Sequence, residues 1–140
     1  MKHRLSPSQF KAMQGKKRKK KSHSEDDLQI SCVSWFDKFI QPKNPHLKLF
    51  AVPNGGKRNI IEAARFKKMG VRAGVADLVL LNGYFDIVPE TIFIELKTEK
   101  GKHSDNQKEF EAWCRKFGYR YITVRSLDGF MELISLFTRK

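Results

Sequence analysis

Apolar and polar residues follow two periods along this chain, and these periods predict its elements. Apolar residues at helical spacing predict four helices, over 24–40, 57–69, 104–117 and 127–137. Short runs rich in apolar and β-branched residues predict four strands, at 47–52, 78–81, 91–96 and 119–124. The order helix, strand, helix, strand, strand, helix, strand, helix is typical of an α/β fold in which helices cover a mixed sheet.

Local signals support the helix boundaries. Ser24 is followed by three acidic residues, as at an N-cap, and Ser104 with Gln107 three positions later is a second start signal. Gly70 and Gly118 follow helical stretches, where glycine commonly ends a helix.

The same patterns predict which side chains are buried. On the helix over 57–69, the residues expected to face inwards are Ile60, Ile61, Ala64 and Met69. Trp35 and Trp113 fall on apolar stripes, so we expect them in the core and not as platforms for stacked bases. The closing helix is expected to bury one face, made of Phe130, Leu133, Ile134 and Phe137.

Three charged residues lie at the ends of the two central strands. Asp77 precedes the first strand, while Glu95 and Lys97 share one face at the end of the second. If the two strands pair antiparallel about a centre near Asp86, Asp77 lies across from Glu95. A charge next to buried surface is costly unless it is paired or bound to a metal.

Two carboxylates suit a hard divalent cation such as Mg²⁺, and the main-chain carbonyl of Leu96 is a further oxygen ligand. A metal there would neutralise a phosphate and lower the pKa of a bound water. Lys97 could position that water, Gln107 could hold Lys97 or a phosphate, and Glu25 could add another acid. An ordinary salt bridge at a sheet end explains the same residues equally well, because Glu-x-Lys with an acid is a weak pattern by itself.

Charge is distributed unevenly over the 140 residues. The net charge is +13, yet residues 1–21 contain nine of the 28 Lys and Arg residues and none of the 15 Asp and Glu residues. Because residues 1–23 also lack apolar periodicity, we expect a disordered basic tail there and one domain over 24–140. The tail predicts a polyanionic partner, usually nucleic acid. A solubilising arm or a nuclear address are the alternatives.

Cys32 and Cys114 lack metal-ligand and CxxC spacing, so we expect free, buried thiols. No apolar run approaches about 20 residues, so no membrane span is expected. The basic N-terminus is not followed by an apolar stretch, which excludes a secretory signal. We therefore expect an intracellular protein.

The run from Val52 to Val124 resembles the VRR-NUC domain, a branch of the PD-(D/E)XK nuclease superfamily. The matching segments are VPNGGKRN at 52–59, KKMGVRAGVADLVLL at 67–81, FIELKTEKGKHSDNQ at 93–107 and FGYRYITV at 117–124. The upstream SEDDLQ at 24–29 is similar to the opening helix of that family. Five ordered segments at suitable separations make the match specific, and it covers nearly everything from residue 24 onward.

The resemblance implies a restriction-endonuclease-like α/β fold, a mixed β-sheet flanked by helices. It implies a DNA endonuclease that hydrolyses phosphodiester bonds with Mg²⁺ or Mn²⁺. It places metal ligands at Asp77 and Glu95, the catalytic lysine at Lys97, and an accessory acid and amide at Glu25 and Gln107.

In one respect the chain departs from the superfamily, since Ala76 replaces the proline that precedes the aspartate. That proline shapes the backbone and does no chemistry, so we expect activity to survive. The length leaves no room for fusion to a larger repair enzyme, so the chain resembles the stand-alone phage-type or bacterial members. This implies the cytoplasm of a bacterial or phage-infected cell. Such members are similar to junction-resolving enzymes, which implies a homodimer acting on branched DNA.

Basic and small residues gather in loops and a helix that border the proposed site, and they predict contacts with DNA phosphates. They are Asn54, Gly55, Gly56, Lys57, Arg58, Arg65, Arg72, Lys100, Lys102 and His103. For each charged residue taken singly, a solvated surface is the default interpretation, and Asn-Gly-Gly by itself favours a simple tight turn.

Two functions are compatible with the sequence. One is a metal-dependent, structure-selective endonuclease of DNA replication, recombination or repair. The other is a non-catalytic basic DNA-binding or replication-accessory protein with a nuclease-like fold. The intact acid pair favours the nuclease, because two carboxylates repel DNA unless a metal lies between them and the phosphate.

Overall fold

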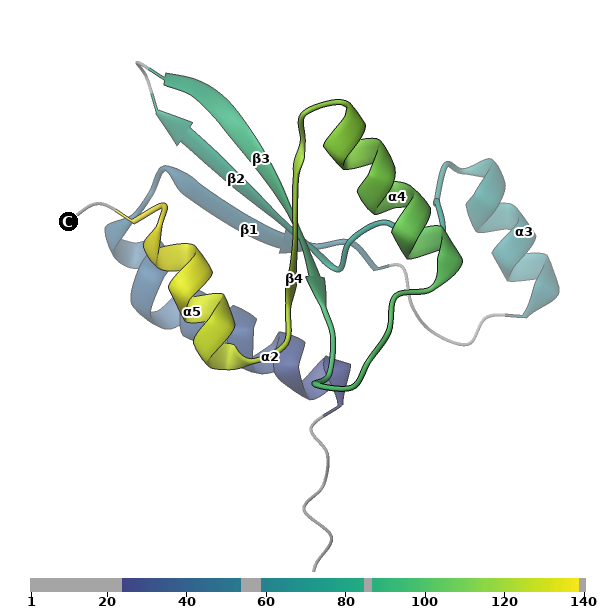
Figure 1. Ribbon diagram of the computed structural model, residues 1–140, viewed down its shortest axis with the longest axis horizontal. Coiled ribbons are helices and arrows are strands. Elements are labelled where there is room, and N and C mark those ends of the chain that lie inside the picture. Colours follow the sequence, from purple (N-terminus) through teal and green to yellow (C-terminus); the bar gives the residue numbers. More distant parts are fainter. Residues whose placement is uncertain (1–23, 54–58, 85–86, 139–140) are drawn as a thin grey trace, which may run out of the picture.

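The computed structural model describes residues 24–53, 59–84 and 87–138. In this part of the chain, four strands form one sheet in the order β1-β2-β3-β4 (Figure 1). The strands are β1 (Leu47–Ala51), β2 (Leu78–Tyr84), β3 (Ile87–Leu96) and β4 (Arg120–Val124). The α-helices are α2 (Glu25–Trp35), α3 (Ile60–Lys68), α4 (Asp105–Lys116) and α5 (Leu127–Ser135). The predicted order of elements and the mixed α/β architecture are confirmed, while the predicted tail over 1–23 lies outside the described residues.

The two central strands pair in the predicted register. β2 and β3 run antiparallel, with Leu78 opposite Ile94 and Val79 opposite Phe93. Continuing this register by one residue sets Asp77 opposite Glu95. The pairing shifts only between Asn82 and Tyr84, at the end of the hairpin that is remote from the two acids.

β3 and β4 run parallel, and α4 connects them as the crossover helix of a βαβ unit. In this ladder Glu95 lies beside Thr123, and Leu96 lies beside Val124. Because parallel strands end at the same edge of a sheet, the carboxyl ends of β3 and β4 meet there.

Different helices cover the two faces of the sheet. On one face, β3 residues Ile92, Ile94 and Leu96 pack with side chains of α2 and α5. On the other face, Phe93 packs against a cluster that includes Cys114 of α4 and Tyr121 of β4. Side chains alternate along a strand, so Glu95 shares the α4 face with Phe93.

The predicted buried face of α5 is confirmed. Phe130 and Ile134 are fully buried, and Leu133 and Phe137 are nearly so. Cys32 and Cys114 are free and buried, as predicted. None of the helices in the described part of the chain has the length and apolar content needed to cross a membrane.

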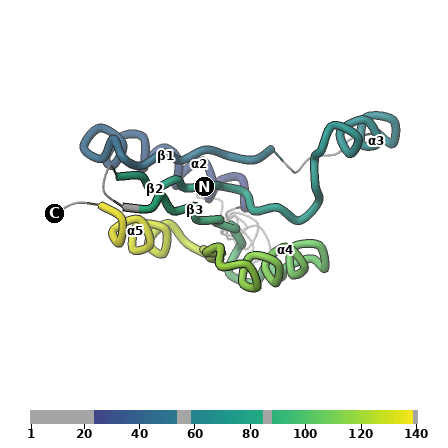
Figure 2. Tube along the Cα trace, turned by 90° about the horizontal axis from the view of Figure 1, so that it is seen from above, coloured from purple at the N-terminus to yellow at the C-terminus, as the bar shows by residue number. Residues whose placement is uncertain are grey.

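The predicted packing of α3 is wrong. Ile60, Ile61 and Met69 are 88%, 82% and 67% exposed, and Ala64 is exposed as well. In two perpendicular views, α3 lies at one extreme of the molecule, away from the sheet (Figures 1 and 2). The periodicity identified a helix correctly, but an amphipathic pattern does not specify which surface covers its apolar side.

The prediction for the two tryptophans is half right. Trp35 packs against the core, with its ring edge-to-face to Phe130 at 6.0 Å between ring centroids. Trp113, in contrast, is 49% exposed, so the prediction that it is buried is wrong. Only the inner part of the α4 stripe, Phe110 and Cys114, joins the buried cluster.

Candidate active site

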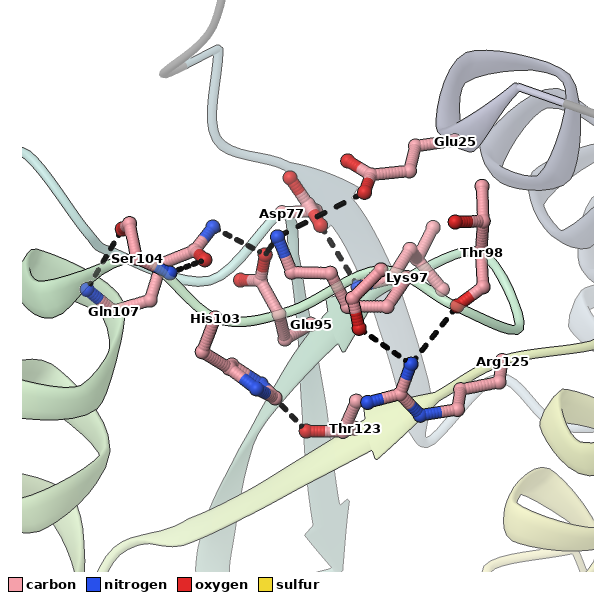
Figure 3. Close-up of polar contacts among 12 residues, drawn as sticks. Glu25, Asp77, Glu95, Lys97, Thr98, His103, Ser104, Gln107, Thr123 and Arg125 are labelled. Carbon is pink, nitrogen blue, oxygen red and sulfur yellow. Dashed lines mark hydrogen bonds and ion pairs between the residues drawn. The ribbon is translucent and has the colours of Figure 1, made fainter.

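Five of the residues predicted from the sequence come together where β3 and β4 end, as Figure 3 shows. They approach from four parts of the chain: the first turn of α2, the residue before β2, the end of β3 and the first turn of α4. They are Glu25, Asp77, Glu95, Lys97 and Gln107.

Asp77 is fixed through both its main chain and its side chain. Its carbonyl oxygen accepts a hydrogen bond from the Val52 amide at 2.9 Å. Its Oδ2 accepts one from the Leu96 amide at 2.8 Å, which ties the entrance of β2 to the end of β3. The preceding Ala76 is fully buried, so packing determines the path of the backbone that leads to the carboxylate.

Glu95 is the most buried acid of the site, with 1% of its surface exposed. Its Oε1 accepts a hydrogen bond from Gln107 Nε2 at 2.7 Å. Its Oε2 is buried and has no hydrogen-bond partner among the described residues. Burial and the nearby Asp77 carboxylate raise the pKa of Glu95 to about 8, and the opposing effect of Lys97 does not outweigh them.

Lys97 lies between two carboxylates. Its Nζ is 3.7 Å from Oε1 of Glu25 and 3.7 Å from Oε1 of Glu95, and the residue is only 6% exposed. Glu25 reaches it because Ser24 starts α2 at this point, with a capping box formed with Asp27. A buried ammonium requires such partners, and here both are acids of the proposed site.

The start of α4 fixes the orientation of Gln107. Ser104 and Gln107 form a capping box: the Ser104 amide donates to Gln107 Oε1 at 2.8 Å, and the Gln107 amide donates to Ser104 Oγ. With its oxygen facing Ser104, the side-chain amide turns its NH₂ group towards Glu95. The capping box that predicted this helix start therefore also orients the Gln107 side chain.

The donor atoms fit a hard divalent cation. Asp77 and Glu95 supply two carboxylates, and Glu95 Oε2 is a buried acceptor that lacks a partner among the described residues. The main-chain carbonyl of Leu96 is the third oxygen of this set. The amide of the same residue donates to Asp77 Oδ2. In the described part of the chain, no cluster of three His, Cys, Asp or Glu side chains suited to a metal is found. Proteins usually hold Mg²⁺ through one or two carboxylates, and water completes the coordination shell. Asp77 and Glu95 are therefore enough to hold this ion.

Five of the ten residues predicted to contact DNA lie in the described part of the chain. Arg65, Arg72, Lys100 and Lys102 are exposed. His103 is half-buried, and its Nε2 is hydrogen-bonded to Thr123 Oγ1 at 2.9 Å. The loop candidates lie outside the described residues: Asn54, Gly55, Gly56, Lys57 and Arg58.

Three residues near the site were not predicted from the sequence. Tyr121 and Thr123 belong to β4, and Arg125 directly follows it. Thr123 lies beside Glu95 and holds His103. The Tyr121 hydroxyl is buried without a partner among the described residues, and burial and Glu95 raise the pKa of that phenol. Arg125 binds the loop that follows Lys97. Only the parallel pairing of β3 and β4, which pattern alone does not specify, brings these residues to the site.

The described elements form an α/β domain with two carboxylates and a lysine at one edge of its mixed sheet. The profile of the VRR-NUC domain family matches residues 22–128, so the chain belongs to that family. A solved structure described as a VRR_NUC domain protein is similar, with a TM-score of 0.60 and 26% sequence identity over 81% of this chain and 86% of that chain. No curated protein matches the sequence.

Proposed function

We propose that this protein is a divalent-metal-dependent endonuclease that hydrolyses phosphodiester bonds in DNA. The observation that carries the proposal is the buried Glu95 carboxylate, which has an unpartnered Oε2 among the described residues and lies near Asp77. Two close acids are mutually unfavourable in a buried site, and a cation bound between them reverses this. Membership of the VRR-NUC family supports the same activity.

Each residue of the cluster has a role in this proposal. Asp77, Glu95 and the Leu96 carbonyl would hold Mg²⁺ or Mn²⁺. When bound, that ion supplies charge neutralisation at the phosphate and a water of lowered pKa. Lys97 stabilises negative charge on the phosphate and orients the attacking water, and its contacts with Glu25 and Glu95 keep its ammonium in place. Gln107 binds Oε1 of Glu95 and leaves Oε2 without a partner among the described residues.

The proposed substrate is branched DNA, and the proposed active form is a homodimer. Exposed basic residues on α3 and in the loop after Lys97 would contact phosphates of the bound strands. Two copies present two sites, which suits cleavage of two strands at a branch in replication, recombination or repair. The exposed apolar side of α3 is a surface that a second copy could cover.

The test is a cleavage assay on labelled four-way junction, flap, single-stranded and linear duplex DNA, with Mg²⁺, Mn²⁺ or EDTA. Asp77→Asn and Lys97→Ala are the site variants. Lys116→Ala, which removes an exposed lysine at the far end of α4, is the matched control. We expect metal-dependent cutting that both site variants lose and the control keeps. Tight binding without cutting in every lane would instead indicate a non-catalytic DNA-binding or replication-accessory protein.

A further inference from the structure

The chain makes a tight turn directly after β3 and Lys97. The Gly101 amide donates to the Thr98 carbonyl at 3.1 Å, which closes a four-residue β-turn. One side chain gathers the carbonyl oxygens of this turn. Arg125 Nη1 donates to the carbonyls of Thr98 at 2.9 Å, Glu99 at 3.4 Å and Gly101 at 2.7 Å. Figure 3 shows Arg125 reaching the turn from the end of β4.

The same turn lies against Glu25. A Cβ added at Gly101 would lie 3.4 Å from Glu25 Oε1 and 3.0 Å from Thr98 Oγ1, so glycine allows an approach that a side chain would obstruct. Glu25 Oε1 is the atom that pairs with Lys97 Nζ. The turn therefore lies against the carboxylate of the Glu25–Lys97 ion pair and limits where that carboxylate can move.

We propose that Arg125 is a positioning residue of the active site. It fixes the turn over 98–101, which begins one residue after Lys97 and leads to the helix that carries Gln107. Lys97 and Gln107 both contact Glu95 Oε1. Their separation depends on the conformation of the chain between them, and Arg125 holds that conformation. The inference rests on the proposed nuclease function.

The environment of Arg125 favours this role over direct contact with a phosphate. Three neutral carbonyls occupy the donors of one terminal nitrogen, in a cage of main-chain atoms. The backbone of Arg125 is also anchored, because the carbonyl of the preceding Val124 accepts a hydrogen bond from the Lys97 amide at 3.0 Å. The ladder of β3 and β4 thus ends immediately before the arginine.

The experiment compares Arg125→Ala and Arg125→Lys with a control, Arg115→Ala. Arg115 is exposed and pairs only with Glu111 among the described residues, on its own helix. Three quantities are measured: the single-turnover cleavage rate, the affinity for DNA at several salt concentrations, and hydrogen exchange of the Gly101 amide. For Arg125→Ala we expect a rate about 10- to 100-fold lower, faster exchange at Gly101, and an unchanged salt dependence of DNA binding. Arg125→Lys keeps a donor group of similar reach and should recover part of the rate.

Two results would overturn the proposal. One is an unchanged rate in Arg125→Ala. The other is a loss of rate that follows weaker DNA binding with a shallower salt dependence, which would make Arg125 a phosphate contact. If Arg125→Ala does not fold, the same three measurements on Arg125→Lys decide. If the wild-type protein cuts no DNA, the proposed function fails. Faster exchange of the Gly101 amide in Arg125→Ala would still show that Arg125 holds the turn, and unchanged exchange would show that it does not.

Discussion

At the scale of single residues, Glu95 is the group whose surroundings explain most about the site. Burial is the largest cause of its raised pKa, followed by repulsion from Asp77. With a pKa of about 8, the carboxyl holds a proton over much of the neutral range when no cation is bound. A cation that binds Glu95 must displace that proton, so we expect metal affinity to increase with pH.

The raised pKa also predicts how stability depends on pH. The Glu95 carboxyl titrates near 4.5 in its ordinary state and near 8 in the folded protein. Between these values the folded state holds a proton that the unfolded state has lost, so the free energy of unfolding falls as pH rises. Glu95→Gln removes this term and should be more stable than wild type at pH 8.5, by roughly 1 kcal/mol or more.

This prediction is measured by urea unfolding in EDTA at several pH values, from about 5 to about 9. The control is Glu109→Gln, which changes an exposed acid on α4. Parallel pH profiles for wild type and Glu95→Gln would contradict it. Added Mg²⁺ should stabilise wild type and leave Glu95→Gln nearly unchanged, because binding to the folded state alone shifts the unfolding equilibrium.

Gln107 offers a substitution that separates two roles of one side chain. Glutamate is as suitable as glutamine in a capping box, so Gln107→Glu keeps the contact with the Ser104 amide. It replaces the NH₂ group that lies 2.7 Å from Glu95 Oε1 with a carboxylate oxygen. We expect an unchanged α4, a further rise in the pKa of Glu95, and cleavage shifted to higher pH, with the rate at neutral pH reduced about 10-fold or more.

The measurements are circular dichroism for the helix and the pH–rate profile for the site. Gln107→Ala, which loses both the cap and the donor, is the comparison. A Gln107→Glu variant with the wild-type pH–rate profile would show that the contact with Glu95 does not affect the reaction.

At the scale of elements, Gly74 links the approach to β2 with the start of α4. It has φ +84°, and a Cβ there would collide with the Asn106 carbonyl and lie 2.8 Å from the Gln107 amide nitrogen. Gly74→Ala should therefore displace the first turn of α4, lower stability by roughly 2–4 kcal/mol and reduce cleavage strongly.

Gly70→Ala is the matched control for this prediction. Gly70 also has positive φ, at +97°, but no atom lies within 4 Å of an added Cβ. It should lose only about 1–2 kcal/mol through backbone strain and retain its cleavage rate. Unfolding and cleavage are measured on both variants, and equal effects would contradict a specific contact at Gly74.

The elements also show how far the sequence alone could lead. The hairpin register and the Asp77–Glu95 pairing were predictable, because apolar runs flank a single turn and alternation fixes the faces. The exposure of Ile60 on α3 was not predictable, since periodicity does not reveal whether a surface covers the helix. Arg125 was not predictable either, because an exposed arginine after a strand carries no pattern, and its partners are main-chain carbonyls of a distant turn.

At the scale of the whole molecule, the basic tail predicts a contribution to DNA affinity that is separable from chemistry. Residues 1–21 contain nine Lys and Arg residues and no acid. Their deletion should weaken DNA binding and flatten its dependence on salt, by about 0.9 in the log–log slope for each DNA phosphate that the tail neutralises. The single-turnover rate at saturating protein should stay the same. An unchanged salt slope would exclude contact between the tail and DNA.

The exposed side of α3 predicts the oligomeric state. Ile60 and Ile61 are 88% and 82% exposed and adjacent, while the basic residues of α3 lie in its second half. Two copies that meet through the apolar first half would cover the isoleucines and keep the like charges apart. The double substitution Ile60→Asp and Ile61→Asp should therefore yield a monomer by sedimentation and light scattering. Ile30→Asp, which changes an apolar residue on α2 that is 64% exposed, is the control and should leave the mass unchanged.

If two sites act together on a branch, the α3 variant should also lose paired cuts at a four-way junction while it still nicks single strands. A wild-type monomer that makes paired cuts would contradict the dimer and leave the chemistry of the single site intact.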